Sequence, residues 1–407
     1  MESPHLSTCS RSSTLGALAP LENIRVLELT EALAGPYCGM MLGDLGADVI
    51  KIERPGIGDQ SRHWGPPFVQ EESAYFLAVN RNKRSLELDI KEQGDLAILH
   101  RLVERSDVFI TNIPRMTSLK NAKIDPDTLR QINPQLIYAA ISGYGHSGPK
   151  ASRGGYDIIA QGEAGLMALT GEPEGAPSRF PTPMADISAG IYTVMGIQAA
   201  LYARDTRDPG VGQFIDVSLF DSQTTWLANI GGSYFADGER PARLGNAHPT
   251  ICPYQPLRAR DKVIIVAVGT ERLWERFCGV LGVADTLMVD ARFATNPLRN
   301  QHRDELVVLL EEILRTRDAD EWLDDFVDNG VPSGPINFPD QTLTDEHLIA
   351  RGMIVELKHP SLGTIKSIGN PIMMSEKGPT YRRHPPRLGE HNEEIRAELS
   401  ADSTMPR

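Results

Sequence analysis

The sequence contains few cysteines, and they form no recognisable pattern. Its 407 residues include only Cys9, Cys38, Cys252 and Cys278, and no two of them have CxxC spacing. Isolated cysteines of this kind provide neither a disulfide framework nor a zinc site, and they fit buried thiols in a reducing compartment. Long apolar runs are also lacking, since none approaches the about 20 residues that span a bilayer.

Positive charge is scarce as well. The chain has 41 Lys and Arg against 54 Asp and Glu, which gives a formal net charge of −13. This surplus of acid argues against nucleic acid or an anionic membrane as a partner, although a local basic pocket can still hold phosphates. The apolar fraction of 41% and the charged fraction of 23% are otherwise ordinary for a soluble globular protein of two or three domains.

The glycine-rich phosphate loop of dinucleotide-binding folds is missing too. Residues 24–29 predict a strand, residues 36–45 a helix and residues 48–53 a second strand, which ends in Glu53, a possible counterpart of a ribose-binding acid. The turn over residues 30–36 contains only Gly35, not the set of glycines that lets the backbone approach a pyrophosphate. A nicotinamide cofactor is therefore not expected.

Helix and strand patterns alternate along the first half of the chain. Further strands are expected at 107–111, 135–141 and 214–219, and helices at 96–106, 126–132 and 187–203, the last apolar on most faces and therefore expected to be buried. Such alternation predicts an α/β fold with an open, Rossmann-like parallel sheet. Ligands of such sheets bind beyond the carboxyl ends of the strands.

The pattern changes after residue 222, where a strand over 262–268 is followed by helical segments at 273–281, 304–315 and 319–329. We expect four parts in the chain. These are a disordered or targeting tail over residues 1–20, a large α/β domain over 21–222, a smaller α+β domain over 225–335, and a segment over 336–407 that returns to the large domain.

One carboxylate stands out among the helix patterns. Asp186 directly precedes the long apolar helix expected from residue 187. The simpler interpretation is a helix cap, because Asp is among the best N-cap residues. The alternative is a nucleophile, because the helix dipole and unpaired N–H groups favour the ionised carboxylate, and an ionised, positioned Asp can attack a thioester and carry an acyl group.

Motifs elsewhere in the chain favour the nucleophile. In chain order they include Ala34-Gly35-Pro36, Leu42-Gly43-Asp44-Leu45-Gly46-Ala47-Asp48, Asn80-Arg81-Asn82-Lys83, Gly143-Tyr144-Gly145, Gly155-Tyr156-Asp157, Met184-Ala185-Asp186, Gly245-Asn246-Ala247-His248-Pro249 and Gly330-Val331-Pro332-Ser333-Gly334-Pro335. Any one of them could be a turn or a cap. Together they resemble the class III coenzyme A transferases, the CaiB/BaiF family, over roughly residues 21–395.

The resemblance implies covalent catalysis by Asp186. The aspartate attacks an acyl-CoA thioester to give a mixed anhydride and free CoA thiolate, which returns to form an aspartyl-CoA thioester. The incoming acid attacks that thioester, and a second anhydride collapses to the new acyl-CoA. This chemistry needs one carboxylate, oxyanion donors and a dry site, with coenzyme A thioesters as substrates and no metal or permanently bound cofactor. The glycines around Tyr144 and the Gly231-Gly232 pair are candidate donor loops or ordinary turns.

The resemblance also implies where coenzyme A binds. Arg54 matches an arginine that contacts phosphate, and Leu88 and Lys91 match the segment that lines the adenine and ribose. Asn112 and Ile113, at the end of a strand, match residues that face the pantetheine and adenine. Members of the family form homodimers in which each chain threads through a hole in the other. The long segment after residue 329 is compatible with such interlocking.

Two alternatives remain within the same fold. The α-methylacyl-CoA racemases pair the aspartate with a histidine for proton transfer, and Tyr156 occupies that position here. A tyrosine with a pKa of about 10 is a poor base at neutral pH, which makes the racemase the weaker alternative. The other alternative is a CoA-binding scaffold without turnover.

Among the transferases, the sequence favours those that act on dicarboxylates. The oxalate/formyl-CoA branch has a glutamine where this chain has Leu33, and its tetraglycine loop has no counterpart here. The runs over 53–59 and 62–67 look most like transferases of the succinyl-CoA:glutarate type, which predicts succinyl-CoA as donor and a C4–C6 dicarboxylate as acceptor. Arg62 and His248 are candidate partners of the distal carboxylate, with Tyr156 nearby in the substrate site, and each could instead be structural. The compartment is left open between the cytoplasm and the mitochondrial matrix.

Overall fold

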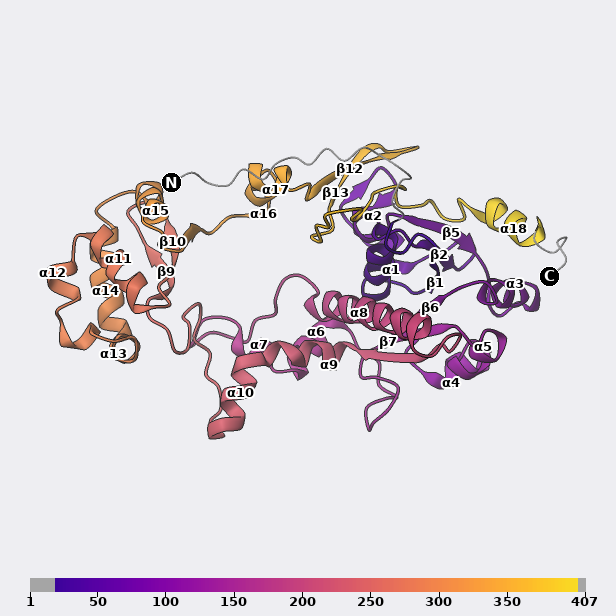
Figure 1. The fold of residues 1–407 in the computed structure, drawn as a ribbon, viewed down its shortest axis with the longest axis horizontal. Helices are drawn as coiled ribbons and strands as arrows, with labels where there is room; N and C mark the ends of the chain where they lie inside the picture. The colour runs from indigo at the N-terminus through magenta and orange to yellow at the C-terminus, as the bar shows by residue number, and fades with distance from the viewer. Residues whose placement is uncertain (1–18, 402–407) are drawn as a thin grey trace. The chain divides into compact units, whose positions relative to one another are not determined.

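The structure is a computed structural model that describes residues 19–401. It divides into two compact units, whose elements are labelled in Figure 1. The first unit comprises residues 19–164, 182–226 and 350–401, and the second comprises residues 165–181 and 227–349. This division differs from the predicted one in two places, because residues 165–181 belong to the second unit and the chain returns at residue 350 rather than 336. Of the predicted tail, residues 1–18 lie outside the described residues.

A six-stranded parallel sheet forms the centre of the first unit. In spatial order its strands are β5 (Lys83–Glu87), β2 (Asp48–Glu53), β1 (Arg25–Leu29), β6 (Val108–Thr111), β7 (Ile137–Ser142) and β8 (Phe214–Ser218). The strand order reverses between β1 and β6, and in open α/β sheets ligands bind beyond the carboxyl ends of the strands at such a reversal. The predicted α/β class with a parallel sheet is confirmed.

Alternation along the strands divides the hydrophobic core between the two faces of the sheet. Val26 and Val108 pack on one face, whereas their neighbours Leu27 and Phe109 pack on the other. The first face is covered by α1 (Ala34–Asp44), α6 (Asp157–Glu163), α8 (Met184–Thr206) and α9 (Leu219–Thr224). The second face is covered by α3 (Gln93–Val103), α4 (Met116–Asn121), α5 (Pro126–Ile132) and α18 (Asn392–Ala401).

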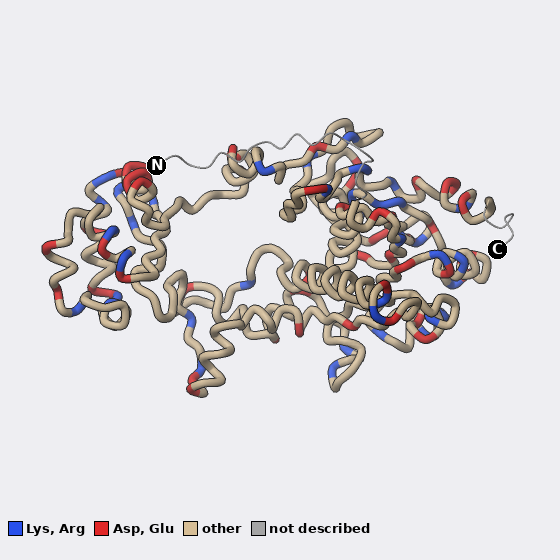
Figure 2. Tube along the Cα trace, in the orientation of Figure 1, with Lys and Arg blue, Asp and Glu red and all other residues tan. Residues whose placement is uncertain are grey.

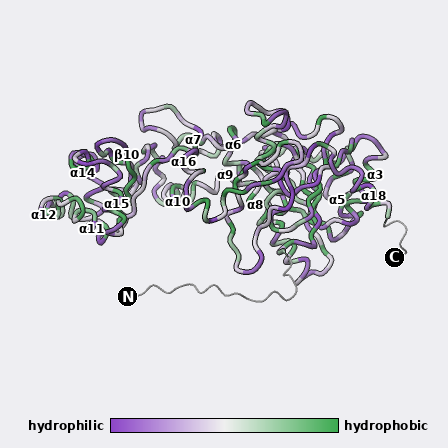
Figure 3. Tube along the Cα trace, turned by 90° about the horizontal axis from the view of Figure 1, so that it is seen from above, coloured by the Kyte–Doolittle hydropathy of each residue, from purple (hydrophilic) through white to green (hydrophobic). Residues whose placement is uncertain are grey.

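Helix α8 begins three residues earlier than predicted and is largely apolar (Figure 3). Among residues 19–401 it is the one helix long and apolar enough to cross a membrane by length and composition, a test that core helices of soluble proteins also pass. It packs against α1, α9 and β7. The prediction that α8 is buried is wrong for one face, on which more than a third of the surface of several side chains is exposed: Ile191, Tyr192, Met195 and Tyr202.

Short elements complete the first unit. They are the hairpins β12 (Ile354–His359) with β13 (Gly363–Ile368) and β3 (Phe68–Val69) with β4 (Glu72–Ser73), the helix α2 (Ala74–Val79), and the 3-10 turns η1 (Gln60–His63) and η2 (Thr225–Leu227). Leu77 of α2 packs with Leu357 and Ile365 of the β12–β13 hairpin. The predicted short strands over residues 354–372 are therefore this hairpin.

The second unit has a core of its own, in which Phe277 and Phe326 stack. Its three-stranded antiparallel sheet has the order β11 (Ser333–Pro335), β10 (Val263–Ala267) and β9 (Tyr254–Arg258). Its helices are α7 (Leu166–Leu169), α10 (Ala228–Asp237), α11 (Glu271–Leu281), α12 (Ala284–Leu287), η3 (Ala291–Phe293), α13 (Asn296–Gln301), α14 (Arg303–Leu314), α15 (Ala319–Asp328), α16 (Pro339–Thr342) and α17 (Glu346–Ala350), the last ending where the chain returns to the first unit. Acidic residues gather on α15 (Figure 2), where Arg317 and Lys262 pair with some of them.

Candidate active site

Two glycines bring the Gly155-Tyr156-Asp157 motif to the carboxyl end of β7. Gly143 follows β7 directly, and a Cβ atom on Gly155 would lie 2.5 Å from the Cα atom of Gly143. Likewise, a Cβ atom added to Gly143 would lie 2.6 Å from the Cα atom of Gly155. No side chain fits between the two backbones, so both positions require glycine. This close approach places Asp157, the first residue of α6, beside the sheet edge at which ligands are expected.

Asp157, rather than Asp186, supplies the cap of helix α8. Its Oδ1 atom accepts a hydrogen bond of 2.9 Å from the backbone N–H of Ala185, and its Oδ2 atom accepts one of 2.8 Å from Gln161 Nε2. The N-cap residue of α8 is Pro183, which has no side-chain cap bond. Asp186 is the third residue of the helix and not its cap. The simpler interpretation of Asp186 as a helix cap is therefore wrong.

The carboxylate of Asp186 has no compensating partner. Among residues 19–401, no hydrogen bond or ion pair to it is found. Burial raises its pKa, and the negative charge of Asp157 raises it further, to about 7. The expectation that the helix N-terminus holds Asp186 ionised is thus wrong, because desolvation and a like charge outweigh the helix dipole. At neutral pH the side chain exchanges between the protonated acid and an unpaired carboxylate. Such a carboxylate is more nucleophilic than one that is hydrogen-bonded or ion-paired.

An apolar and aromatic cluster begins at the residue after Asp186. The next residue, Ile187, packs with Leu33 and Tyr75 in a small cluster. One turn further along α8, a Cβ on Gly190 would lie 2.8 Å from the carbonyl oxygen of Ala34, so this face of α8 lies directly against the start of α1. Asp186 occupies the same helix face, above the loop that follows β1.

Tyr75 is a site residue that no sequence motif marked. Burial raises the pKa of its phenol, and the charges of Asp186, Asp157 and Asp59 raise it further, to about 12. The phenol therefore stays protonated and can donate a hydrogen bond near the acidic pair. Its ring packs edge-on against Trp64 with 5.0 Å between the ring centres.

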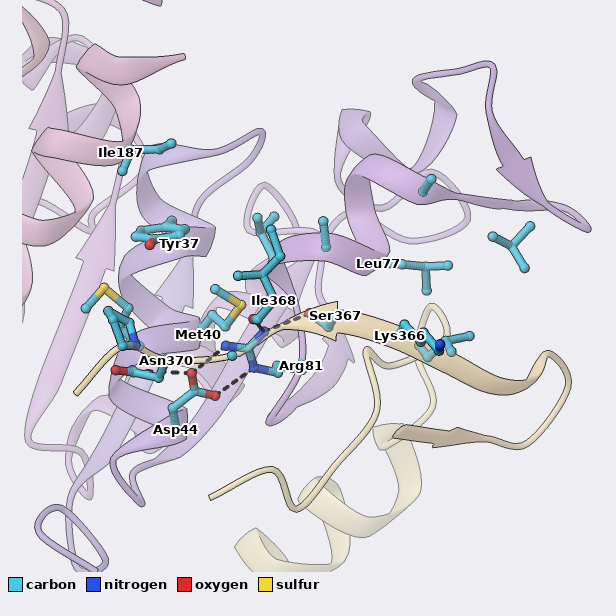
Figure 4. A pocket seen from close by; sticks show the side chains of 18 of the residues that line it. Tyr37, Met40, Asp44, Leu77, Arg81, Ile187, Lys366, Ser367, Ile368 and Asn370 are labelled. Carbon is cyan, nitrogen blue, oxygen red and sulfur yellow. Dashed lines mark hydrogen bonds and ion pairs between the residues drawn. The ribbon is translucent and has the colours of Figure 1, made fainter. Parts of the chain in front are cut away.

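A pocket of about 600 Å³ opens beside Ile187 (Figure 4). Its walls are mostly apolar side chains of α1 and α2 and residues 364–371 of the β13 region. At one end the buried Arg81 binds Asp44 through both guanidinium and carboxylate branches, at 2.9 and 2.7 Å. This ion pair is satisfied internally, so the pocket offers mainly apolar surface next to the turn that carries Asp186.

The predicted CoA-binding residues follow neighbouring strands of the sheet. Arg54 follows β2, Leu88 follows β5, and Asn112 follows β6, so all lie at the carboxyl edge on either side of the strand reversal. Arg54 is exposed and pairs with Glu31 at 3.1 Å. Asn112 holds the backbone of Glu31 from both sides, at 3.2 and 2.8 Å. These two hydrogen bonds connect the loop after β1 to the end of β6, the neighbouring strand at which the order reverses.

The other predicted CoA-binding residues are less uniform. The side chain of Leu88 is buried in the core, at 2% exposure, so only its backbone can face a ligand. Lys91 is exposed, and its backbone N–H donates to Asp89. Ile113 is partly buried against the same core.

The three predicted acceptor-site residues differ in their surroundings. Arg62 is buried and bonds Glu53 through Nε and Nη2, each at 2.8 Å, and its guanidinium stacks on Phe76, which is the structural alternative named for it. Tyr156 is 71% exposed. His248 belongs to the second unit, where its Nδ1 atom accepts a hydrogen bond from the Thr250 N–H. The Gly231-Gly232 pair lies inside α10, so it is not a loop.

A buried network of charges holds residues 30–36, which form the loop after β1 and the start of α1. Lys51 Nζ lies 2.9 Å from Glu28, 2.8 Å from Asp59 and 2.9 Å from the carbonyl oxygen of Thr30. Lys83 Nζ binds Glu28 and the carbonyl oxygen of Pro36, each at 2.8 Å. Burial raises the pKa of Asp59, but Lys51 and the N–H groups of nearby residues outweigh burial and bring it to about 2. The loop that lies under Asp186 is therefore fixed at both ends.

Asp59 also stabilises an unusual backbone conformation in the loop after β1. Its Oδ1 atom accepts a hydrogen bond of 3.0 Å from the N–H of Ala32, a non-glycine residue with φ of 70°. Such a conformation is unusual for alanine and persists only where neighbouring contacts impose it.

No group of three or more His, Cys, Asp or Glu that could hold a metal is found among residues 19–401.

The chain is similar to a known sequence family, to named CoA-transferases and to a solved crystal structure. The sequence model of CoA-transferase family III matches residues 21–392. A succinate–glutarate CoA-transferase of Agrobacterium fabrum is 43% identical over 387 residues, covering 93% of this chain and 96% of that protein. An acetyl-CoA:oxalate CoA-transferase of Acetobacter aceti is 37% identical over 384 residues, covering 94% and 96%. The crystal structure of a CaiB/BaiF family protein from Brucella suis has a TM-score of 0.83 at 42% identity, covering 94% of this chain and 100% of that one.

Proposed function

The chain belongs to CoA-transferase family III, and we propose that it moves coenzyme A from succinyl-CoA to a C4–C6 dicarboxylate. That it is a CoA-transferase follows from the family and from relatives that match nearly the whole chain. One observation carries the proposal within the molecule. The Asp186 carboxyl group has a pKa raised by burial, it directly precedes the apolar cluster of Ile187, and no cation or donor among residues 19–401 binds it.

The proposed reaction proceeds through carboxylate chemistry at Asp186. Its ionised oxygen attacks the thioester carbon of succinyl-CoA, and the C–S bond breaks to give a mixed anhydride and CoA thiolate. The thiolate attacks the aspartyl carbonyl and releases succinate, leaving an aspartyl-CoA thioester. The acceptor carboxylate displaces the thiolate as a second anhydride, and the thiolate then attacks the acceptor carbonyl, which frees Asp186 and the new acyl-CoA. Apolar surroundings limit hydrolysis of the anhydrides.

Hydroxylamine separates this mechanism from its alternatives. With acyl-CoA present, hydroxylamine should trap the acyl form of Asp186 and inactivate the enzyme, and a mass shift should appear on the peptide that contains α8. A racemase or a scaffold would lose no activity and show no modification at Asp186. An unmodified peptide in an enzyme that still exchanges CoA would contradict the covalent route.

The names of relatives support the choice of acceptor, and they leave a second candidate. The Agrobacterium relative is named for succinate and glutarate, while the Acetobacter relative, at slightly lower identity, is named for oxalate. Leu33 stands where the oxalate branch has glutamine, which favours the longer dicarboxylates. A panel with glutarate, oxalate and the monoacid pentanoate, each offered with succinyl-CoA and acetyl-CoA, decides between them. Equal rates with glutarate and pentanoate would contradict a dicarboxylate site.

We also propose that coenzyme A lies along the carboxyl edge of β2, β1 and β6, with its phosphates near Arg54 and Lys91. Arg54 is exposed, and among residues 19–401 its one ion-pair partner is the half-buried Glu31, so a phosphate can compete for it. Arg54→Ala should raise the KM for succinyl-CoA about tenfold with little change in kcat. The matched control is Arg153→Ala, which removes an exposed arginine of the same unit paired with Glu163. An unchanged KM would remove Arg54 from the site.

The exposed apolar face of α8 supports a homodimer, interlocked as in the family. Ile191, Met195 and Tyr202 are 37%, 57% and 64% exposed, which is unusual for an apolar helix beside a core. A second copy of the chain that covers this face would bury them. Light scattering should give twice the mass of the 44.7 kDa chain, and Met195→Asp should shift it toward the monomer.

A further inference from the structure

Helix α8 presents the proposed nucleophile in its first turn, where helices are least constrained. The first four N–H groups of a helix have no partner inside the helix, and a cap normally supplies one. Pro183, at the N-cap position, supplies no side-chain bond. The Asp157 carboxylate instead accepts a hydrogen bond from the N–H of Ala185, the residue next to Asp186.

Asp157 is itself held in place. It is the first residue of α6 and 8% exposed, and its second oxygen is bonded to Gln161 one turn along the same helix. Two residues before it, Gly155 lies against Gly143 at the end of β7, with no room for a side chain. The contact of Gly155 with Gly143 and the bond from Ala185 to Asp157 therefore connect the end of β7 to the turn that contains Asp186.

From this geometry, and resting on the proposed function of Asp186 as nucleophile, we propose that Asp157 is a positioning residue for the transfer reaction. Its bond to the Ala185 N–H fixes the first turn of α8 and so aims the Asp186 carboxylate at the thioester carbon. A carboxylate that attacks within a preorganised site must be held close to its line of attack, and small misplacements cost large factors in rate. Asp157 would touch neither substrate nor reacting atoms.

The negative charge of Asp157 has a second consequence. It faces Asp186 from α6, while Tyr75 faces both acids from α2, and the charge of Asp59 also reaches Tyr75. Tyr75 stays neutral, and neither α2 nor α6 contains a basic residue. The negative charge of Asp157 is therefore not offset by a cation from these two helices. Removing that charge while keeping the hydrogen bond should make Asp186 ionise at lower pH.

Two substitutions separate the bond from the charge. Asp157→Asn keeps an oxygen that accepts the Ala185 N–H but removes the charge, whereas Asp157→Ala removes both. With succinyl-CoA and the best acceptor, Asp157→Ala should lower kcat about 10- to 100-fold while the KM for succinyl-CoA changes less than threefold. Asp157→Asn should restore kcat to within about threefold of wild type at pH 8.5 and move the acidic limb of the pH profile to lower pH.

Hydrogen exchange gives a readout that does not depend on activity. The backbone amides at the start of α8 should exchange faster in Asp157→Ala than in Asp157→Asn or wild type. If Asp157→Ala does not fold, Gln161→Met, which removes the hydrogen bond from Gln161 to Asp157, serves in its place and should show the same pattern more weakly. An Asn variant as slow as the Ala variant, or wild-type kcat in the Ala variant, would overturn the proposal. Failure of wild-type enzyme with every acid would instead overturn the proposed function, and the exchange data would still decide the role of the bond.

Discussion

The first unit contains two aspartates whose pKa values are shifted in opposite directions. Asp59 lies beside Lys51 at 2.8 Å and accepts hydrogen bonds from the backbone of Ala32 and Ser61, and its pKa falls to about 2. Asp186 receives no such partner among the described residues, faces the like charge of Asp157, and has a pKa raised to about 7. Asp59 holds the loop after β1 through the N–H of Ala32, whereas Asp186 is the proposed nucleophile.

This contrast follows from elementary electrostatics. A buried charge is tolerated where a countercharge and donors replace water, and removing one partner leaves an expensive orphan. A buried carboxyl group without them is costly in its ionised form, and folds retain such groups mainly at functional sites. Four predictions test whether Asp59 and Asp186 differ in this way.

The largest effect is expected from removing the uncompensated carboxylate. Asp186→Ala should lower the rate of CoA exchange between succinyl-CoA and free acid by about 10³-fold or more, because no covalent intermediate can form. Asp205→Asn, which changes an exposed aspartate of the same helix, should exchange at the wild-type rate. Steady-state assays of the two variants are the measurement. If Asp186→Ala kept a tenth of wild-type activity, Asp186 would not be the nucleophile.

Removing the partner of the compensated carboxylate should act on stability instead. Lys51→Met leaves Glu28 and Asp59 buried without their shared cation, which should cost about 3–5 kcal/mol of unfolding free energy. Urea denaturation followed by hydrogen exchange of peptides from β1 and β2 measures the first unit specifically. Lys262→Met breaks an exposed pair with Asp320 and should unfold like wild type. Equal stability of Lys51→Met and wild type would mean that the network contributes little.

The parallel sheet was predictable because hydrophobic strands and helices alternate in sequence, and β2 and α5 appear with the predicted bounds. Strand β5 was not, because Lys83, Arg84 and Ser85 read as a surface segment. Each is at most 3% exposed, since Glu28, Asp48 and Glu53 supply partners from neighbouring strands. Hydrophobic periodicity cannot detect a strand whose charges are neutralised by residues distant in sequence.

The site divides in a similar way. Motifs marked Asp186 as the candidate nucleophile and Arg54 and Asn112 as candidates at strand ends, and these assignments stay predictions. The raised pKa of Asp186 was unpredictable, since it depends on burial in the folded chain and then on the charge of Asp157, which lies two residues beyond the Gly143–Gly155 contact. Tyr75 had no sequence signal at all. Local sequence marks which groups are present, whereas their protonation depends on which groups fold beside them.

The pH dependence of exchange should show the state of Asp186 directly. Since its pKa is raised to about 7, the carboxylate is ionised above that pH and protonated below it. The value of kcat/KM for succinyl-CoA should be constant above about pH 8 and fall roughly tenfold per unit below pH 7. Asp59, with a pKa of about 2, should add no limb in this range. A profile that stays flat down to pH 5.5 would contradict the raised pKa.

The smallest effect is a gain of stability on removing the reactive charge. The pKa of Asp186 is about 7 in the folded state against an ordinary value of 3.8, so the unfolded chain loses its proton first as pH rises. Below both values the two states bind the proton equally and Asp186 has no pH-linked effect. Between them the ionised unfolded state is favoured, and above about pH 7 the full cost is present. Asp186→Asn removes this cost and should stabilise the protein by about 1–2 kcal/mol at pH 8 and by less at pH 5. Asp59→Asn should destabilise at both pH values, because it weakens the pair with Lys51. Thermal unfolding of both variants at the two pH values measures the difference, and a loss of stability in Asp186→Asn would place Asp186 with Asp59 as a structural acid.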